Sequence, residues 1–401
     1  MTPVPSSARH AARQVGTAAL RAALPQLTRL PHPGASPRND RGARLDRELD
    51  VLLRWMARGQ RPLEEMSPRE ARETYRFGVA LLGPRATRPV QMISAEGLPI
   101  RIHRADVGSR DGAEGRRSTA HGSRLRPAVV FFHGGGFVIG DAAEYDGVVQ
   151  SMVRDSGCTF VAVPYRKAPE HPFPAGIEDA NRGYRWVVDN APRLGLDPER
   201  IAVMGDSAGA TLAINVAQSA ATAGRGRPAL QCLVYPAVDF HGAVTTPGSG
   251  PRYPSREAFA NGYILTRDTI EYFARHYVAG PVDAADPRLV PLAYPHPERM
   301  PPTLLVTAGF DPLRDEGEAY AERLTSAGVP VRHLEWPELV HGAFTMGGAL
   351  RAPRRRVARL AATLGRMLRD GTTLLPRPSP DRGVDQREAA TAAAGRRSKA
   401  S

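Results

Sequence analysis

The sequence predicts an α/β protein with a mostly parallel sheet and helices on both faces. Short apolar runs of strand length alternate with stretches of helical periodicity along most of the 401 residues. One run, Ile201 to Val203, leads through a Gly-x-Ser-x-Gly turn directly into an alanine-rich helical stretch. Another run, Pro302 to Thr307, is soon followed by Asp311, where open α/β sheets carry functional groups. The length allows one large domain with a smaller addition, or two domains.

The net charge of +13 is concentrated at the two ends of the chain. Residues 1–44 carry seven Arg and one Asp, and residues 351–401 carry thirteen Arg or Lys and four acids, which leaves about −2 for the middle. The ends are poor in aromatic residues, so we expect no nucleic-acid partner. We predict a disordered basic arm over 1–44 and a disordered basic tail over 371–401. A frayed amphipathic helix over Ala11 to Leu27 that touches a membrane is the alternative for the arm.

Nothing in the sequence has the pattern of an export or membrane-spanning segment. The N-terminus lacks an apolar stretch of seven residues, and no run of eighteen apolar residues occurs. Cys158 and Cys232 stand in apolar, strand-like surroundings, where buried free thiols are expected rather than a disulfide or a metal site. We therefore expect a soluble cytoplasmic protein that is not stably inserted in a membrane.

Two helices are expected before the sheet begins. One apolar face follows helical spacing and consists of Leu45, Leu49, Leu52, Leu53 and Met56. A second helix opens at Ser67-Pro-Arg-Glu70, where Ser67 and Glu70 can form a capping box, and it ends at Gly83-Pro84. These helices could form a lid over a site or serve only for packing.

The first strands lead to a glycine-rich loop. Pro99 to Val107 alternates like an edge strand, residues 108–126 resemble a long exposed loop, and Pro127 to Phe132 predicts a buried parallel strand. The strand ends in His133-Gly-Gly-Gly-Phe137, whose bare backbone lets N–H groups approach an anion closely. The alternative is a glycine-rich turn without a ligand. We expect His133 to brace this loop rather than act as a base.

The middle of the chain continues the alternation of strands and helices. The expected elements are a strand at Cys158–Pro164, a helix at Ile177–Asn190 and a strand at Ala229–Val234. Between the first two, a proline-rich turn carries Glu170 and His171, for which a structural role is favoured. Residues 237–280 break the alternation and include a helix at Thr266 to Val278. This segment could be a second part of a cap or an ordinary insertion.

The C-terminal part supplies two further functional candidates. Asp311 follows the strand at Pro302 to Thr307, and His341 follows the last strand at Val329 to Trp336. A terminal helix is expected over Arg351 to Leu368. This helix and the last strand could support a homodimer.

The Gly-x-Ser-x-Gly turn can present a nucleophile. Glycines 205 and 209 carry no Cβ, so Ser207 can occupy a very tight strand-to-helix turn. The helix N-terminus then lies beneath its hydroxyl. The N–H groups that could bind an oxyanion are those of Gly135, Gly136 and Ala208.

A serine nucleophile needs a base within hydrogen-bond reach and an anion that orients the base. His341 is the candidate base and Asp311 the candidate anion, in the order Ser207, Asp311, His341 that occurs on α/β-hydrolase sheets. Asp315 and Glu316 are alternative acids. Asp311 is preferred because it lies nearest the strand end.

With these motifs the chain resembles the hormone-sensitive-lipase-like branch of the α/β-hydrolases, which includes many bacterial carboxylesterases. The resemblance covers residues 45–370 and rests on the stretches HGGGFVIGD, YRKAPEHPFPA, GDSAGA, GFDPLRDEGEAYAERL and HGAF. It implies a helical cap over residues 45–95, a catalytic domain over 96–370 and no cofactor or metal. It also implies the Ser207, Asp311 and His341 triad. The oxyanion donors that it implies are Gly135, Gly136 and Ala208, and the supporting residues are His133, Gly134 and Asp206.

The function expected from these residues is hydrolysis of small carboxylic esters with short to medium acyl chains. An amidase or lactonase could use the same triad, because acyl-transfer machinery does not reveal the leaving group. A non-catalytic small-molecule receptor on this fold is a further alternative. The presence of His341 argues against it. Ala343 stands where the family usually has Phe, which could widen the pocket beside the triad.

Overall fold

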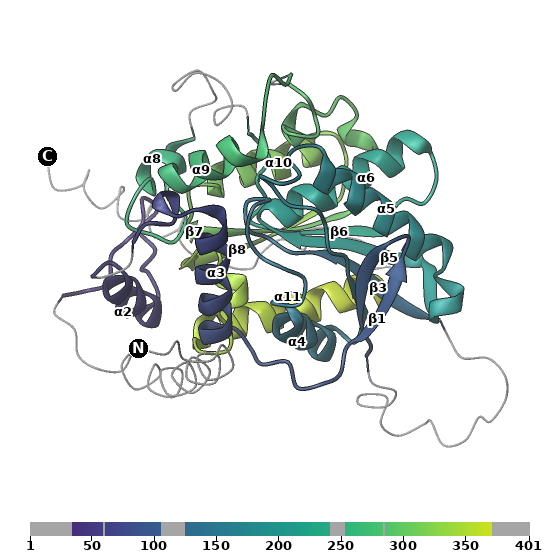
Figure 1. Cartoon of the computed structure of the whole chain (residues 1–401), viewed down its shortest axis with the longest axis horizontal. Coiled ribbons are helices and arrows are strands. Elements are labelled where there is room, and N and C mark those ends of the chain that lie inside the picture. Colours follow the sequence, from purple (N-terminus) through teal and green to yellow (C-terminus); the bar gives the residue numbers. More distant parts are fainter. Residues whose placement is uncertain (1–33, 59–60, 106–124, 241–252, 284, 371–401) are drawn as a thin grey trace, which may run out of the picture.

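The computed structural model describes residues 34–58, 61–105, 125–240, 253–283 and 285–370. Their centre is an eight-stranded sheet with the strand order β1-β2-β4-β3-β5-β6-β7-β8 (Figure 1). Its strands are β1 Gln91–Ala95, β2 Leu98–His103, β3 Arg126–Phe132, β4 Thr159–Ala162, β5 Leu196–Asp206, β6 Leu230–Val234, β7 Thr303–Phe310 and β8 Val331–Val340. The six neighbouring strands β4, β3, β5, β6, β7 and β8 pair in parallel, as the alternation of strands and helices predicts.

Several predictions fall on residues outside these ranges. They concern the helix at Ala11 to Leu27, nearly all of the loop at 108–126, residues 241–252 of the second cap segment and the basic tail at 371–401.

The antiparallel end of the sheet differs from the sequence-based expectation. A two-residue turn, with φ of +50° at Glu96 and +85° at Gly97, folds β1 back onto β2. The predicted edge strand β2 therefore pairs on both sides, with β1 and with β4, and β1 is the outer strand. Residues 91–95, which we expected in the helical cap, belong to the sheet. The mostly exposed side chains of β1 give it little apolar signal in the sequence.

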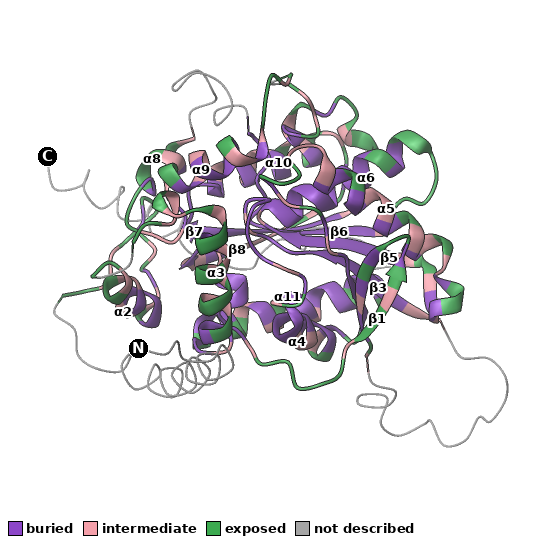
Figure 2. Ribbon diagram, in the orientation of Figure 1, coloured by how far each residue is buried: buried purple, intermediate pink, exposed green. Residues whose placement is uncertain are grey.

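Helices cover both faces of the sheet because successive strand side chains point to opposite sides. On β3, Val130 and Phe132 join the core cluster that contains α5 and α6, whereas Val129 and Phe131 join the cluster that contains α4 and α11. Figure 2 shows the buried strands between these layers. The covering helices are α4 Asp146–Ser156, α5 Ala175–Asp189, α6 Ala208–Ala223, α10 Arg314–Ser326 and α11 Arg351–Asp370.

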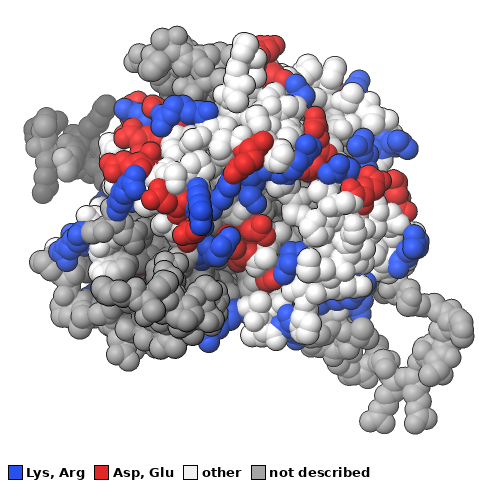
Figure 3. All heavy atoms as spheres, viewed as in Figure 1, with Lys and Arg blue, Asp and Glu red and all other residues white. Residues whose placement is uncertain are grey.

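Four further helices lie on one side of the molecule, on the left in Figure 1. They are α2 Arg47–Met56, α3 Pro68–Leu82, α8 Pro254–Ala258 and α9 Arg267–Tyr277. The predicted capping box of α3 is present: the Ser67 Oγ accepts from the Glu70 N–H at 3.3 Å, and the Glu70 carboxylate accepts from the Ser67 N–H at 2.9 Å. On the face seen in Figure 3, basic and acidic side chains are interspersed.

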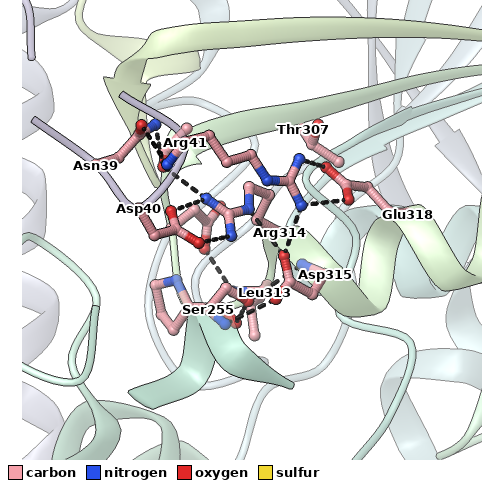
Figure 4. A network of polar contacts seen from close by, with 12 residues as sticks. Asn39, Asp40, Arg41, Ser255, Thr307, Leu313, Arg314, Asp315 and Glu318 are labelled. Atoms are coloured by element: carbon pink, nitrogen blue, oxygen red, sulfur yellow. Dashed lines mark hydrogen bonds and ion pairs between the residues drawn. The ribbon is translucent and has the colours of Figure 1, made fainter. Parts of the chain in front are cut away.

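Packed structure begins before Leu45, where we expected it to start. The buried Asn39 side chain donates to the Gly309 carbonyl at 3.1 Å. Asp40 pairs with Arg314 at 2.6 Å, and Arg41 pairs with Glu318 at 2.7 Å (Figure 4). This segment is held by polar contacts, so apolar periodicity gives no sign of it.

Candidate active site

The loop between β5 and α6 is a sharp turn that presents Ser207. The serine has φ +54° and ψ −125°, a backbone conformation that L-residues rarely adopt. A Cβ on Gly205 would lie 2.2 Å from the Gly209 backbone, and one on Gly209 would lie 2.2 Å from the Phe132 carbonyl oxygen. Both glycines are therefore required for the turn to close against the end of β3.

The structure brings the three predicted residues Ser207, His341 and Asp311 into one hydrogen-bonded chain. The Ser207 Oγ lies 2.9 Å from the His341 Nε2, and the His341 Nδ1 lies 2.8 Å from the Asp311 Oδ2. Asp311 is fully buried, and its other oxygen accepts from the Leu313 N–H at 2.8 Å. The imidazole is thus held between an anchored carboxylate and a partly accessible hydroxyl.

The two alternative acids are engaged elsewhere. Asp315 accepts hydrogen bonds from Arg41, Arg314 and the Ser255 N–H, as Figure 4 shows for this network. Glu316 is buried and accepts from the Arg256 guanidinium and from the Val238 N–H. Of the three acids considered, Asp311 is the one hydrogen-bonded to His341.

The glycine-rich loop after β3 turns sharply beside the serine. Gly135 and Gly136 have φ of +113° and +57°, and the Gly135 carbonyl accepts from the Val138 and Ile139 N–H groups. A Cβ on Gly136 would lie 2.2 Å from the ring of Phe273 in α9, so this helix packs directly against the loop. Within the described residues, the N–H groups of Gly135, Gly136 and Ala208 donate to no protein acceptor.

Asp206 links the start of this loop to the serine turn. Its Oδ1 accepts from the Gly134 N–H at 2.9 Å, and its Oδ2 accepts from the Tyr145 hydroxyl at 3.1 Å. Burial raises the pKa of Asp206 to about 7. The residue before the serine therefore fixes the first glycine of the loop.

His133 lies inside the loop. Its Nδ1 is 2.7 Å from the Gly134 carbonyl oxygen, and its ring stacks on Tyr165 with 4.4 Å between the ring centroids. Burial lowers the pKa of His133 to about 4, which keeps the ring neutral at neutral pH. These contacts tie the loop to the segment after β4.

Sequence reasoning missed two aromatic residues of the site. Tyr235 follows β6, and the centroids of its ring and the His341 ring are 4.5 Å apart; Tyr145 binds Asp206. Phe273, which covers Gly136, lies on the predicted helix at Thr266 to Val278. An aromatic residue at a strand end was an available signal for Tyr235. Tyr145 comes from a segment without a motif.

The described part of the chain offers neither a metal site nor a membrane-spanning helix. No group of three or more His, Cys, Asp or Glu side chains there could hold a metal ion. Among the same residues, no helix is both long and apolar enough to span a bilayer.

A Ser–His–Asp chain beside a glycine loop, at the carboxyl ends of parallel strands, defines the class of serine hydrolases built on α/β sheets. The chain belongs to the alpha/beta hydrolase fold family, whose sequence profile matches residues 129–345, and to its hormone-sensitive-lipase-like branch. An ethyl acetate hydrolase of Pseudomonas putida is 33% identical over 299 residues, which cover 72% of this chain and 87% of that enzyme. A carboxylesterase of Mycobacterium tuberculosis is 39% identical over 246 residues, 60% of this chain and 74% of that one. A hyperthermophilic esterase of the archaeon Pyrobaculum calidifontis superposes with a TM-score of 0.70 at 34% identity, covering 80% of this chain and 98% of that chain.

Proposed function

We propose that this protein is a serine carboxylesterase that hydrolyses small esters with short to medium acyl chains. The observation that carries the proposal is the hydrogen-bonded chain Ser207–His341–Asp311 beside a loop in which the Gly135 and Gly136 N–H groups have no protein acceptor among the described residues. The names of the ethyl acetate hydrolase and the carboxylesterase support the same bond type. No step of the reaction requires a metal or a cofactor.

The proposed reaction proceeds in two halves. The Ser207 Oγ attacks the ester carbonyl carbon while its proton moves to the His341 Nε2, and Asp311 stabilises the imidazolium. The oxyanion accepts hydrogen bonds from the N–H groups of the loop and of Ala208. His341 then returns the proton to the leaving alcohol, which departs from an acyl-serine. In the second half, water attacks the acyl carbon while its proton moves to His341. The bond to the Ser207 Oγ then breaks, His341 passes the proton to that oxygen, and the carboxylic acid is released.

We further propose that α2 and α3, together with α8 and α9, form a two-part cap over this site. The close approach of Phe273 to Gly136 supports the second part. The homodimer, the cytoplasmic location and the absence of a nucleic-acid partner stay predictions from sequence.

The proposed function is tested with p-nitrophenyl esters from acetate to palmitate. We expect kcat/KM to peak at short or medium acyl chains. Absence of hydrolysis across the series by the folded protein would contradict the proposal. Hydrolysis of amides or lactones but not of esters would move the activity to the alternative leaving groups.

A further inference from the structure

Helix α3 makes a direct polar contact with the glycine loop. The Arg72 Nε donates to the Val138 carbonyl at 2.8 Å, two residues beyond Gly136. Its Nη2 donates to the Ala168 carbonyl at 2.8 Å, and Ala168 in turn donates its N–H to the Phe137 carbonyl at 2.9 Å. One guanidinium therefore joins α3 to the end of the loop and to the segment that supports it.

The Glu170 carboxylate fixes the orientation of that guanidinium. It accepts two parallel hydrogen bonds from Arg72, at 2.7 Å and 2.5 Å. A bidentate pair of this kind holds the guanidinium plane in a set direction. The predicted structural role of Glu170 thus takes a specific form: it aims Arg72 at the two carbonyl oxygens.

A second contact leads from α3 to the start of the loop. The Tyr75 hydroxyl lies 2.6 Å from the Tyr145 hydroxyl, which donates to Asp206 at 3.1 Å. Asp206 accepts from the Gly134 N–H. This chain of hydrogen bonds ends on the residue that precedes Gly135.

The two contacts come from one face of the same helix. Arg72 and Tyr75 are three residues apart, so their side chains are neighbours on α3. One reaches the loop after Gly136 and the other reaches it before Gly135. The two glycines therefore lie between two points of attachment to α3.

We propose that α3 sets the position of the oxyanion loop, with Arg72 and Tyr75 as positioning residues for the reaction. The proposal rests on the proposed esterase function and deepens it. N–H donors stabilise the transition state only when they point at the place that the oxyanion will occupy. Movement of α3 would shift both ends of the loop, so the cap and the catalytic machinery are mechanically coupled.

A displaced oxyanion loop has a characteristic kinetic effect. An interaction that forms mainly in the transition state changes kcat, while ground-state binding of the substrate stays the same. A purely structural role for Arg72 would instead lower the thermal midpoint and leave kcat of the folded enzyme unchanged. The split between kcat and KM therefore separates the two roles.

The test compares Arg72→Met, Tyr75→Phe and the matched control Arg76→Gln in the full chain. Arg76 lies next to Tyr75 on α3, but its ion pair with Glu144 does not involve the loop. With p-nitrophenyl butyrate we expect kcat of Arg72→Met to fall about 10²-fold at nearly constant KM, the effect of a small misplacement. Tyr75→Phe loses one neutral hydrogen bond, so kcat falls roughly two- to tenfold. Arg76→Gln keeps the wild-type kcat.

A second readout uses an aryl trifluoromethyl ketone, which forms a tetrahedral adduct with the serine. We expect its inhibition constant to rise in Arg72→Met in proportion to the fall in kcat, while inhibition by the product acid stays unchanged. If Arg72→Met does not fold, Tyr75→Phe, which loses only one oxygen atom, carries the test.

Three outcomes would overturn the proposal. They are wild-type kcat in both Arg72→Met and Tyr75→Phe, equal losses of kcat in Arg76→Gln, and a loss that appears only in KM. Each of these arises with an active wild-type enzyme and leaves the proposed function intact. A wild-type protein without esterase activity would refute the proposed function, and the positioning role would fall with it.

Discussion

Ser207 combines an unusual backbone conformation with a side chain that faces His341. Replacement by alanine removes the Oγ and keeps the Cβ that the turn already accommodates, so the fold should remain. We expect Ser207→Ala to lower kcat about 10⁶-fold, as for triad nucleophiles elsewhere. Hydrolysis of p-nitrophenyl butyrate and the thermal midpoint check the two expectations. Ser151→Ala is the control: it removes a hydroxyl that donates to the Gly147 carbonyl within its own helix α4. Residual activity of Ser207→Ala within tenfold of wild type would disprove the assignment of the nucleophile.

The raised pKa of Asp206 predicts a pH-dependent stability. The carboxyl ionises near its ordinary value of 3.8 in the unfolded chain and near 7 in the folded protein. Between these values the folded state holds the additional proton, so the free energy of unfolding decreases as the pH rises through this window. Above about pH 7 both states are ionised and the decrease ends.

Asp206→Asn removes this titration and keeps one oxygen as an acceptor. We therefore expect the wild-type thermal midpoint, relative to that of Asp206→Asn, to fall between pH 4 and pH 7 and then to level off. Thermal unfolding in a series of buffers measures the difference. Parallel midpoint curves over the whole range would show that Asp206 does not titrate there.

The residues of the site divide by how the sequence reveals them. Ser207, Asp311 and His341 each stand in a short motif just after a predicted strand, and the parallel sheet brings such positions to one edge. Arg72 lies on the predicted capped helix and Tyr145 on a segment that carries no motif, and both meet the loop only because the helices pack there. Local patterns therefore predict the reacting groups, while the groups that support them depend on tertiary packing.

At the scale of elements, α8 is tied to α10 by a buried ion pair. Arg256 of α8 binds Glu316, whose side chain is fully buried. Arg256→Met would leave this carboxylate without its cation, and removal of one partner from a buried pair costs about 3–5 kcal/mol of folding free energy. Because the Arg256 side chain is itself 20% exposed, we expect a loss near the lower end, about 3 kcal/mol.

Denaturant unfolding measures this loss, with Arg267→Gln as the matched control. Arg267 of α9 pairs with Glu257 of α8, but both side chains are exposed. The control should therefore change the free energy of unfolding by less than about 1 kcal/mol. Equal effects of the two substitutions would show that the Arg256–Glu316 pair has no special weight.

The elements themselves were predictable in proportion to their apolar signal. The buried strands β3, β6 and β7 and the capped helix α3 match the predicted segments closely. The sequence reasoning missed β1, whose burial pattern is largely exposed, α8, which has only five residues, and the longer helix α4. The first two bury too little apolar surface to leave a periodic pattern, whereas the apolar face of α4 went unrecognised.

At the scale of the whole molecule, segments far apart in the chain meet around the loop that follows β7 and carries Asp311. Asn39 reaches the carbonyl of Gly309, two residues before Asp311. Asp40 binds Arg314, whose side chain is 3% exposed and also donates to the Gly309 carbonyl. On the other side, Ser255 donates its hydroxyl to the Pro312 carbonyl. The loop that carries Asp311 is therefore held both by residues 39–40 and by helix α8.

This arrangement predicts where truncation of the N-terminus becomes harmful. A disordered arm over 1–44 implies that residues 1–42 can be removed without loss, but Asn39, Asp40 and Arg41 contact the body of the protein. A variant that lacks 1–42 should therefore be less stable than one that lacks 1–33. The expected difference is about 1–3 kcal/mol, because the nearly buried Arg314 loses one of its two carboxylate partners.

Thermal unfolding of the two truncated variants measures this difference, and Asp40→Asn in the full chain should reproduce part of it. Since the same contacts reach the residues around Asp311, the shorter variant should also lose esterase activity at a lower temperature. Identical midpoints for both truncations would show that the segment adds nothing to stability. The triad would then be held by the sheet and the insertion, and the expectation of a dispensable arm would be correct.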